Sequence, residues 1–160
     1  MKKNIIENII RDDTKGMSVI VKTIARMMIA LILLFGFYII LYGHLTPGGG
    51  FAGGVILAIA YTLMMLAFGR HIALVKFSNF WASIFDNLGM LAFIMIAYIG
   101  LAFGFVIHNF IWHGNPFHLV SAGIIPLCNI AIGIKVGAAL YAIFIGLSIY
   151  GRLILQEEEE

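Results

Sequence analysis

Lys135 is the residue of this 160-residue chain whose chemistry is hardest to explain by packing alone. It lies about 13 residues into the last apolar segment, roughly 20 Å from one end of the helix that such a segment would form. Because contact with lipid there costs roughly 3 kcal/mol or more, this lysine should face protein or water. It could be a proton or cation relay, or a structural lysine paired with a carboxylate. Intramembrane ionisable groups favour the first interpretation.

Asp86 is the other charged residue at an apolar segment. We expect it at the cytoplasmic start of the third apolar helix, where the helix dipole alone would favour an acidic side chain. Lys135 stands 16 residues before Gly151, on the order of 20 Å from the cytoplasmic end of its own helix. A lysine side chain cannot cover that distance, so the sequence predicts no direct pair with Asp86. A carboxylate of another subunit or a hydrated cavity would then accommodate Lys135.

Three histidines recur every five residues in one connection: His108, His113 and His118. A metal site usually has closer spacing and cysteine or carboxylate companions, and none is nearby. A proton-collecting surface is possible, because histidine titrates near neutral pH. Interfacial histidines beside aromatic residues are the preferred interpretation. His44 lies at the same surface and could join a polar patch there. No metal site and no cofactor are predicted.

A glycine-rich run separates the first two apolar segments. Pro47 fixes its own φ and biases Thr46 away from the helical region, and the glycines after it reach backbone angles that other residues avoid. The run could hold an anion or line an ion path, but a phosphate loop would continue with Lys-Ser/Thr, whereas Val55 and Ile56 follow here. We therefore interpret it as a tight turn that leads into a close helix contact. Its residues are Pro47, Gly48, Gly49, Gly50, Gly53 and Gly54.

Membrane-spanning helices must position these residues. The chain is 62% hydrophobic and only 11% charged, whereas soluble domains are roughly 25% charged. It is therefore expected to be an all-α integral membrane protein of the cell (plasma) membrane, with one membrane domain over residues 1–160. The sequence predicts a cytoplasmic or interfacial segment at 1–19, four spans at about 20–43, 51–69, 86–107 and 122–150, and an acidic tail at 151–160.

The charges predict the orientation of these helices. Basic residues gather before the first span, in the 70–79 connection and after the last span, which places both termini in the cytoplasm. The glycine turn and the histidine connection then face outward. In the first 16 residues four isoleucines share one helical face, which indicates a short amphipathic helix at the membrane surface or a frayed tail. No cleavable signal peptide is apparent.

Pairs of glycines four residues apart indicate helix packing. Gly100 and Gly104 form one pair, and Gly133 and Gly137 form another, so the chain should pack against other subunits as well as itself. No nucleophile–base set, dinucleotide fingerprint or concentrated basic groove is present in the sequence. By itself the chain is expected to be no enzyme and to bind no nucleic acid.

Two sequence runs resemble a known family. The run from Gly43 to Gly54, GHLTPGGGFAGG, resembles the signature of the MnhB-like subunits of the Mrp (also called Mnh) multisubunit sodium/proton antiporters, and the run from Asn129 to Gly137 resembles the last-helix motif of that family. The resemblance implies a small four-helix subunit without pump machinery, whose large complex I-like partner subunits carry the main proton channels. Homologues in archaeal membrane-bound hydrogenases and ferredoxin-linked complexes imply a second setting, in which electron transfer drives ion movement.

The sequence and this resemblance thus predict a non-catalytic membrane subunit of an Mrp-type cation/proton module, needed for assembly and a candidate for lining the ion path, with Na⁺ and H⁺ as transported ions. Lys135 is the first candidate for coupling, and His44 and Asp86 follow it. A pure scaffold subunit without ion-path residues is the alternative. A self-contained channel or carrier is less favoured, because no internal repeat is visible.

Overall fold

The computed structural model describes residues 17–104, 109–111, 115, 117–118 and 121–159. The predicted N-terminal amphipathic helix, His108 and His113 therefore lie outside the described residues. Within this part of the chain all regular structure is helical: α2 (Val19–Leu41), α3 (Gly50–Phe68), α4 (Arg70–Lys76), α5 (Asn79–Ala102) and α6 (Ile125–Glu159). All except α4 are long and apolar enough to cross a membrane, which confirms the prediction of an all-α protein with four spans.

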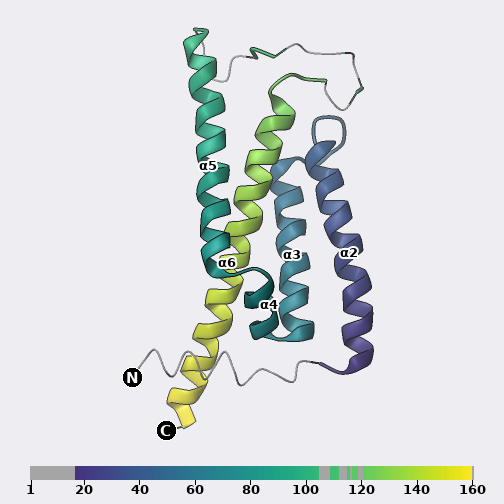
Figure 1. The fold of residues 1–160 in the computed structure, drawn as a ribbon, viewed down its shortest axis with the longest axis vertical. Coiled ribbons are helices and arrows are strands. Elements are labelled where there is room, and N and C mark those ends of the chain that lie inside the picture. The colour runs from purple at the N-terminus through teal and green to yellow at the C-terminus, as the bar shows by residue number, and fades with distance from the viewer. Residues whose placement is uncertain (1–16, 105–108, 112–114, 116, 119–120, 160) are drawn as a thin grey trace.

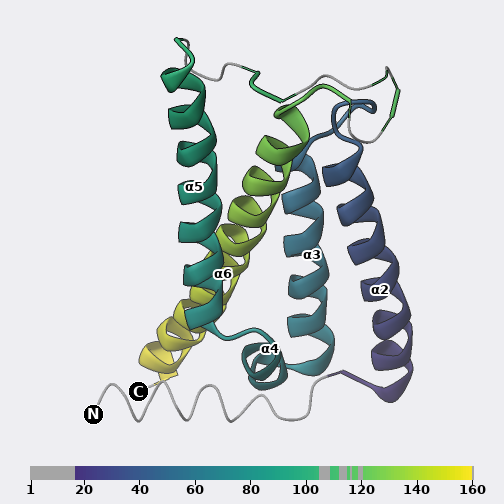
Figure 2. The same cartoon turned by 45° about the horizontal axis from the view of Figure 1, so that its top comes forward.

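The four long helices stand in one row rather than in a closed bundle. Figures 1 and 2 show the order α2, α3, α6, α5, and the three largest helix contacts follow the same order, with a smaller contact between α2 and α6. The last helix in the chain, α6, thus lies between α3 and α5, and it tilts across both. In a row each helix keeps two open sides, and only 11% of the most apolar stretch of α5 is buried within the chain.

The ends of the spans differ from the expected ones mainly in the second half of the chain. The first two spans begin and end within two residues of the prediction, but α5 begins at Asn79 rather than at 86. Ser78 precedes it as an N-cap, and its hydroxyl accepts a hydrogen bond from the Trp81 N–H at 3.4 Å. The last helix begins at Ile125 and continues to Glu159 instead of ending near 150.

A short helix, α4, occupies the connection that was expected between the second and third spans. Gly69 starts it with φ +92°, a left-handed conformation that favours glycine. The Tyr141 hydroxyl of α6 donates to the carbonyl oxygens of Ala73 at 3.2 Å and Phe77 at 2.7 Å. Tyr141 is 1% exposed, and it packs against Tyr61 and Phe77 with ring centroids 5.4 and 5.1 Å away. These contacts fasten α4 to the middle of α6.

Candidate functional site

Asp86 and Lys135 form an ion pair where α5 crosses α6. The Lys135 Nζ atom lies 2.9 Å from Asp86 Oδ1. The prediction that these residues could not pair within the chain is therefore wrong. Asp86 is not at the start of its helix, because α5 begins seven residues earlier, so Asp86 lies about 10 Å into it. Distance along α6 was also a poor measure of depth, because α6 is tilted relative to α5 (Figure 2).

Gly89 makes this crossing possible. A Cβ at this position would lie 2.7 Å from the Ala131 carbonyl oxygen, 2.8 Å from the backbone nitrogen of Lys135 and 2.9 Å from the Lys135 Cβ. Any larger residue would therefore push α5 away from α6. Gly89 lies three residues after Asp86, so both share one face of α5. The pair thus lies directly beside the point of closest approach between the two helices.

The ion pair is half-exposed on the surface of the isolated chain. Side-chain exposure is 40% for Lys135 and 36% for Asp86. Asp86 is the only acidic residue between positions 14 and 156 of the sequence, so the spans hold no second carboxylate for Lys135. An ammonium group has three donors and a carboxylate about four acceptor sites, and their mutual bond uses one of each. Both groups therefore keep capacity for an ion, a water molecule or a group of a neighbouring protein.

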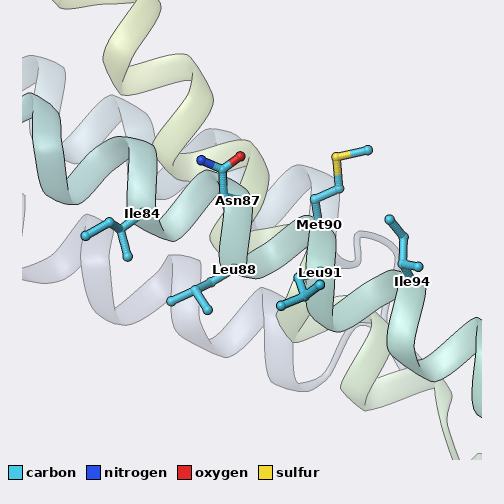
Figure 3. A pocket seen from close by; sticks show the side chains of 6 residues that line it. All are labelled: Ile84, Asn87, Leu88, Met90, Leu91 and Ile94. Carbon is cyan, nitrogen blue, oxygen red and sulfur yellow. The ribbon is translucent and has the colours of Figure 1, made fainter.

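The surface of α5 next to the ion pair is apolar except for the side-chain amide of Asn87. A hollow of about 470 Å³ lies on it, and Figure 3 shows that all its lining residues come from this one helix: Ile84, Asn87, Leu88, Met90, Leu91 and Ile94. Asn87 donates to the carbonyl oxygen of Ser83 at 2.9 Å, so part of its polarity is satisfied within α5. No other described helix covers this stripe. It follows that this side of α5 is open to lipid or to another protein.

The crossing of α3 and α6 is built from glycine. A Cβ on Gly54 would lie 2.8 Å from the Gly133 carbonyl oxygen, and one on Gly137 would lie 3.3 Å from the Gly54 carbonyl oxygen. A Cβ on Gly50 would collide with the backbone of Asn129. On its other side α3 meets α2 at Gly53, whose Cβ would lie 3.0 Å from the Gly36 carbonyl oxygen. These glycines let the three helices approach closely, and the Ile40 side chain of α2 lies against both Gly53 and Gly133.

The second glycine pair of the sequence is placed differently. Gly100 is buried in α5. Gly104 lies beyond the end of that helix with φ +102°, and a Cβ there would meet no described atom within 4 Å. Within the described part of the chain Gly104 thus makes no helix contact, because α5 ends at Ala102; its packing against another subunit stays a prediction.

The glycine run closes the connection between α2 and α3. The Tyr42 carbonyl oxygen accepts hydrogen bonds from the backbone N–H groups of Leu45 at 2.8 Å and Thr46 at 2.9 Å, and from the Thr46 hydroxyl at 3.0 Å. After the exposed Pro47, Gly48 and Gly49 take φ values of +152° and +112°. Only glycine adopts such angles cheaply. The first residue of α3 follows at once, so the run is a turn leading directly into a helix contact.

A small polar group lies at this end of the row. The Gly50 N–H donates to Asn129 Oδ1 at 3.2 Å, and His44 Nε2 lies 3.3 Å from the His118 carbonyl oxygen. Asn129 Nδ2 and His44 Nδ1 are buried atoms that find no partner among the described residues. Lys135 faces α5 and Asn129 faces α3, so they belong to different faces of α6. The structure thus unites Lys135 with Asp86 and leaves His44 in a separate polar group.

Two residues that make these contacts were not identified from the sequence. Gly89 could have been found, because its spacing from Asp86 puts a small residue beside the charge on one helix face. Tyr141 carried no such signal, since its hydroxyl bonds depend on the unforeseen helix α4. Among the described residues no group of three histidine, cysteine or acidic side chains could hold a metal ion.

Comparison with known proteins places the chain in a family. Residues 20–142 match the family model of a domain related to the MnhB subunit of Na⁺/H⁺ antiporters. An uncharacterized protein of Methanocaldococcus jannaschii is 37% identical over 128 residues, which are 76% of this chain and 48% of that protein. A Staphylococcus haemolyticus protein that carries the name antiporter subunit mnhB2 is 44% identical over 57 residues, 36% of this chain and 40% of that protein.

A solved structure agrees with this placement. A chain in the structure of the membrane-bound sulfane sulfur reductase, an archaeal respiratory membrane complex, superposes with a TM-score of 0.73 at 37% identity, covering 84% of this chain and 60% of that chain. The chain spans less than two thirds of the length of each of these relatives. The family match covers nearly all of the first three spans and most of the fourth, including both residues of the ion pair. The chain is a multi-pass membrane protein that belongs to the MnhB-related family of Na⁺/H⁺ antiporter subunits.

Proposed function

We propose that this chain is a non-catalytic subunit of an Mrp-type cation/proton antiporter module, and that its Asp86–Lys135 pair lies on the ion path. The module works either as a stand-alone sodium/proton antiporter or within a redox-driven respiratory complex of the cell membrane. The family match supports the first setting. The similarity to a chain of the archaeal sulfane sulfur reductase supports the second.

The half-exposed ion pair carries this proposal. A lysine and an aspartate within spans are costly unless they pair or contact water, and such residues commonly mark ion or proton pathways. Here they meet at 2.9 Å, yet both remain open on the outer surface of the row. The open side lets a cation contact Asp86, or a proton reach it, while Lys135 moves to another partner.

Both termini would lie in the cytoplasm, and further membrane subunits would be the partners of this chain. Lys22, Arg26, Arg70 and Lys76 lie at the end of the row where α4 lies, whereas the connection between α2 and α3 has no basic residue. This asymmetry supports cytoplasmic termini. The open side of α5 would pack against other membrane subunits, which include the large complex I-like antiporter subunits. The coupled ions would be Na⁺ and H⁺.

Ion transport by the assembled complex tests the proposal. Vesicles would hold the whole complex with wild-type chain, Lys135→Ala, Asp86→Asn, or Ile134→Ala as a control on the same turn of α6. Sodium-dependent proton movement would be followed with a pH-sensitive dye, and complex content would be checked by native gel. We expect normal assembly and lost transport in the first two variants only. Normal transport in fully assembled Lys135→Ala complex would contradict the ion-path role.

A scaffold role is the second candidate. The glycine contacts of α3 with α2 and α6 support it, because they build a rigid plate whose open sides could hold larger subunits in register. This candidate expects Lys135→Ala to transport normally once assembled. If instead the Lys135→Ala complex fails to assemble, the charge-exchanged variant Asp86→Lys with Lys135→Asp distinguishes the ion-path role from the scaffold role. Rescue of assembly without transport supports the ion path, and rescue of both supports the scaffold.

A further inference from the structure

A second hollow lies at the opposite edge of the row, between α2, α3 and α4. Its volume is about 430 Å³, within the roughly 300–1,000 Å³ typical of small-molecule sites. Two basic side chains and four apolar ones line it: Arg26, Ile29, Met64, Phe68, Ile72 and Lys76. Three helices contribute to it, so the hollow depends on the folded arrangement and not on one helix surface.

Within residues 17–156 the two cations of this hollow have no carboxylate partner. Asp86 is the only acidic residue between positions 14 and 156, and it is paired with Lys135. The Arg26 guanidinium carbon lies 5.8 Å from the centroid of the Phe68 ring, which is a cation–π distance. A guanidinium that stacks on a ring still presents N–H donors at its edge, where they suit a phosphate group.

The position of the hollow matches the boundary between hydrocarbon and headgroups. Phe68 is the last residue of α3, and Lys76 is the last residue of α4. The floor is apolar, because Ile29 is buried with Ala25, Ala60 and Ala67, and Met64 and Phe68 pack on that cluster. An occupant would therefore meet cations at one side and hydrocarbon-like side chains at the other.

We propose that this hollow binds the headgroup of an anionic phospholipid, with its phosphate against Arg26 and Lys76 and the first part of an acyl chain along Ile29, Met64 and Ile72. Basic pockets between transmembrane helices are suited to anionic headgroups. Charge complementarity and the mixed lining favour a lipid over an acidic protein segment, which would leave the apolar lining without a partner. The site lies apart from the Asp86–Lys135 pair and does not depend on the transport function.

Native mass spectrometry of the purified full-length chain tests this inference. Phosphatidylglycerol and phosphatidylcholine with identical acyl chains would be titrated onto delipidated protein. We expect phosphatidylglycerol to bind the wild type roughly tenfold or more tightly, and the double variant Arg26→Gln with Lys76→Gln to lose this preference. The charge-preserving exchange Arg26→Lys with Lys76→Arg should retain most of it. Lys22→Gln, one turn earlier on α2 and not part of the lining, should retain all of it.

Three results would overturn the inference. One is equal binding of the two lipids by the wild type, and another is an unchanged preference in the double variant. The third is a double variant that binds the lipids as the wild type does but whose whole complex lacks a subunit. Arg26 and Lys76 would then pair with an acidic group of that subunit and not with a lipid. Circular dichroism and size-exclusion profiles would check that each variant keeps its helices. If the double variant fails this check, the single variants are measured instead. Arg26→Gln and Lys76→Gln should each lower the logarithm of the affinity ratio between phosphatidylglycerol and phosphatidylcholine by about half.

Discussion

The two crossings that α6 makes are opposite in kind. Against α3 it is joined through glycine, with the Gly54 and Gly133 backbones so close that a Cβ on Gly54 would lie 2.8 Å from a carbonyl oxygen. Against α5 it has one such close point, at Gly89, and beside it the half-exposed pair of Asp86 and Lys135. The first crossing, at its glycine contacts, contains no charged side chain. The second contains two.

The two crossings therefore differ in whether they can respond to an ion. Backbone packed against backbone has no alternative arrangement of similar energy, because any separation leaves voids. An ion pair that is open on one side can exchange its partner for water, an ion or a neighbouring side chain. We therefore infer that the crossing of α3 and α6 is fixed and that the ion pair between α5 and α6 is the region able to respond.

The largest effect is expected from filling the fixed crossing. Gly54→Val would force α3 and α6 apart, because the obstructing atoms belong to the backbone, and we expect a loss of about 3 kcal/mol in stability. Thermal unfolding in detergent measures it. Gly146→Val on α6 is the matched control, because a Cβ at Gly146 meets no described atom within 4 Å. Equal unfolding temperatures for the two variants would contradict the fixed crossing.

A smaller and more local effect is expected at the other crossing. Gly89→Leu should push α5 away from α6, separate Asp86 from Lys135, and cost about 2 kcal/mol. Hydrogen exchange followed by mass spectrometry would locate the change. We expect faster exchange in α5 and unchanged exchange in α2 and α3. Loss of protection throughout the row would show that the two crossings are not independent.

The ion pair itself should contribute less than either glycine contact. A double-mutant cycle with Asp86→Asn and Lys135→Gln is expected to give a coupling of about 1.5 kcal/mol in unfolding free energy, because the side chains touch but remain half-exposed. High salt should reduce the coupling. A coupling near zero would mean that the residues are neighbours without being energetic partners.

The smallest effect is expected at the anchor of α4. Tyr141→Phe removes two hydrogen bonds to the carbonyl oxygens of Ala73 and Phe77 but keeps the ring packing, so it should cost about 0.5–1 kcal/mol. Transport by the assembled complex should be unchanged, because neither of the two hydrogen bonds involves a residue of the ion pair. Lost transport at normal assembly would extend the responsive region from α5 to α4.

The sequence predicted the number and nature of the spans, because apolar length decides them. It failed at Asp86 for a physical reason: a charge in an apolar stretch usually marks a membrane boundary, and here it is a paired residue inside the span. The pairing depends on the tilt of α6 and on Gly89, which are tertiary features that no window of sequence contains. Helix α4 was missed because seven residues carry too short a periodic pattern, and its fastening by Tyr141 comes from a distant part of the chain.

The place of α6 between α3 and α5 has a consequence for how the protein is made. During synthesis α5 enters the membrane before the helix that must separate it from α3 exists. Until α6 is released, α5 lacks the helix with which it makes its main contact, and the lysine that neutralises Asp86 has not yet been inserted. Insertion of α6 is therefore the step that joins α5 to the packed helices α2 and α3. A nascent chain arrested before that step would expose the Asp86 carboxylate to lipid and become a substrate for membrane quality control.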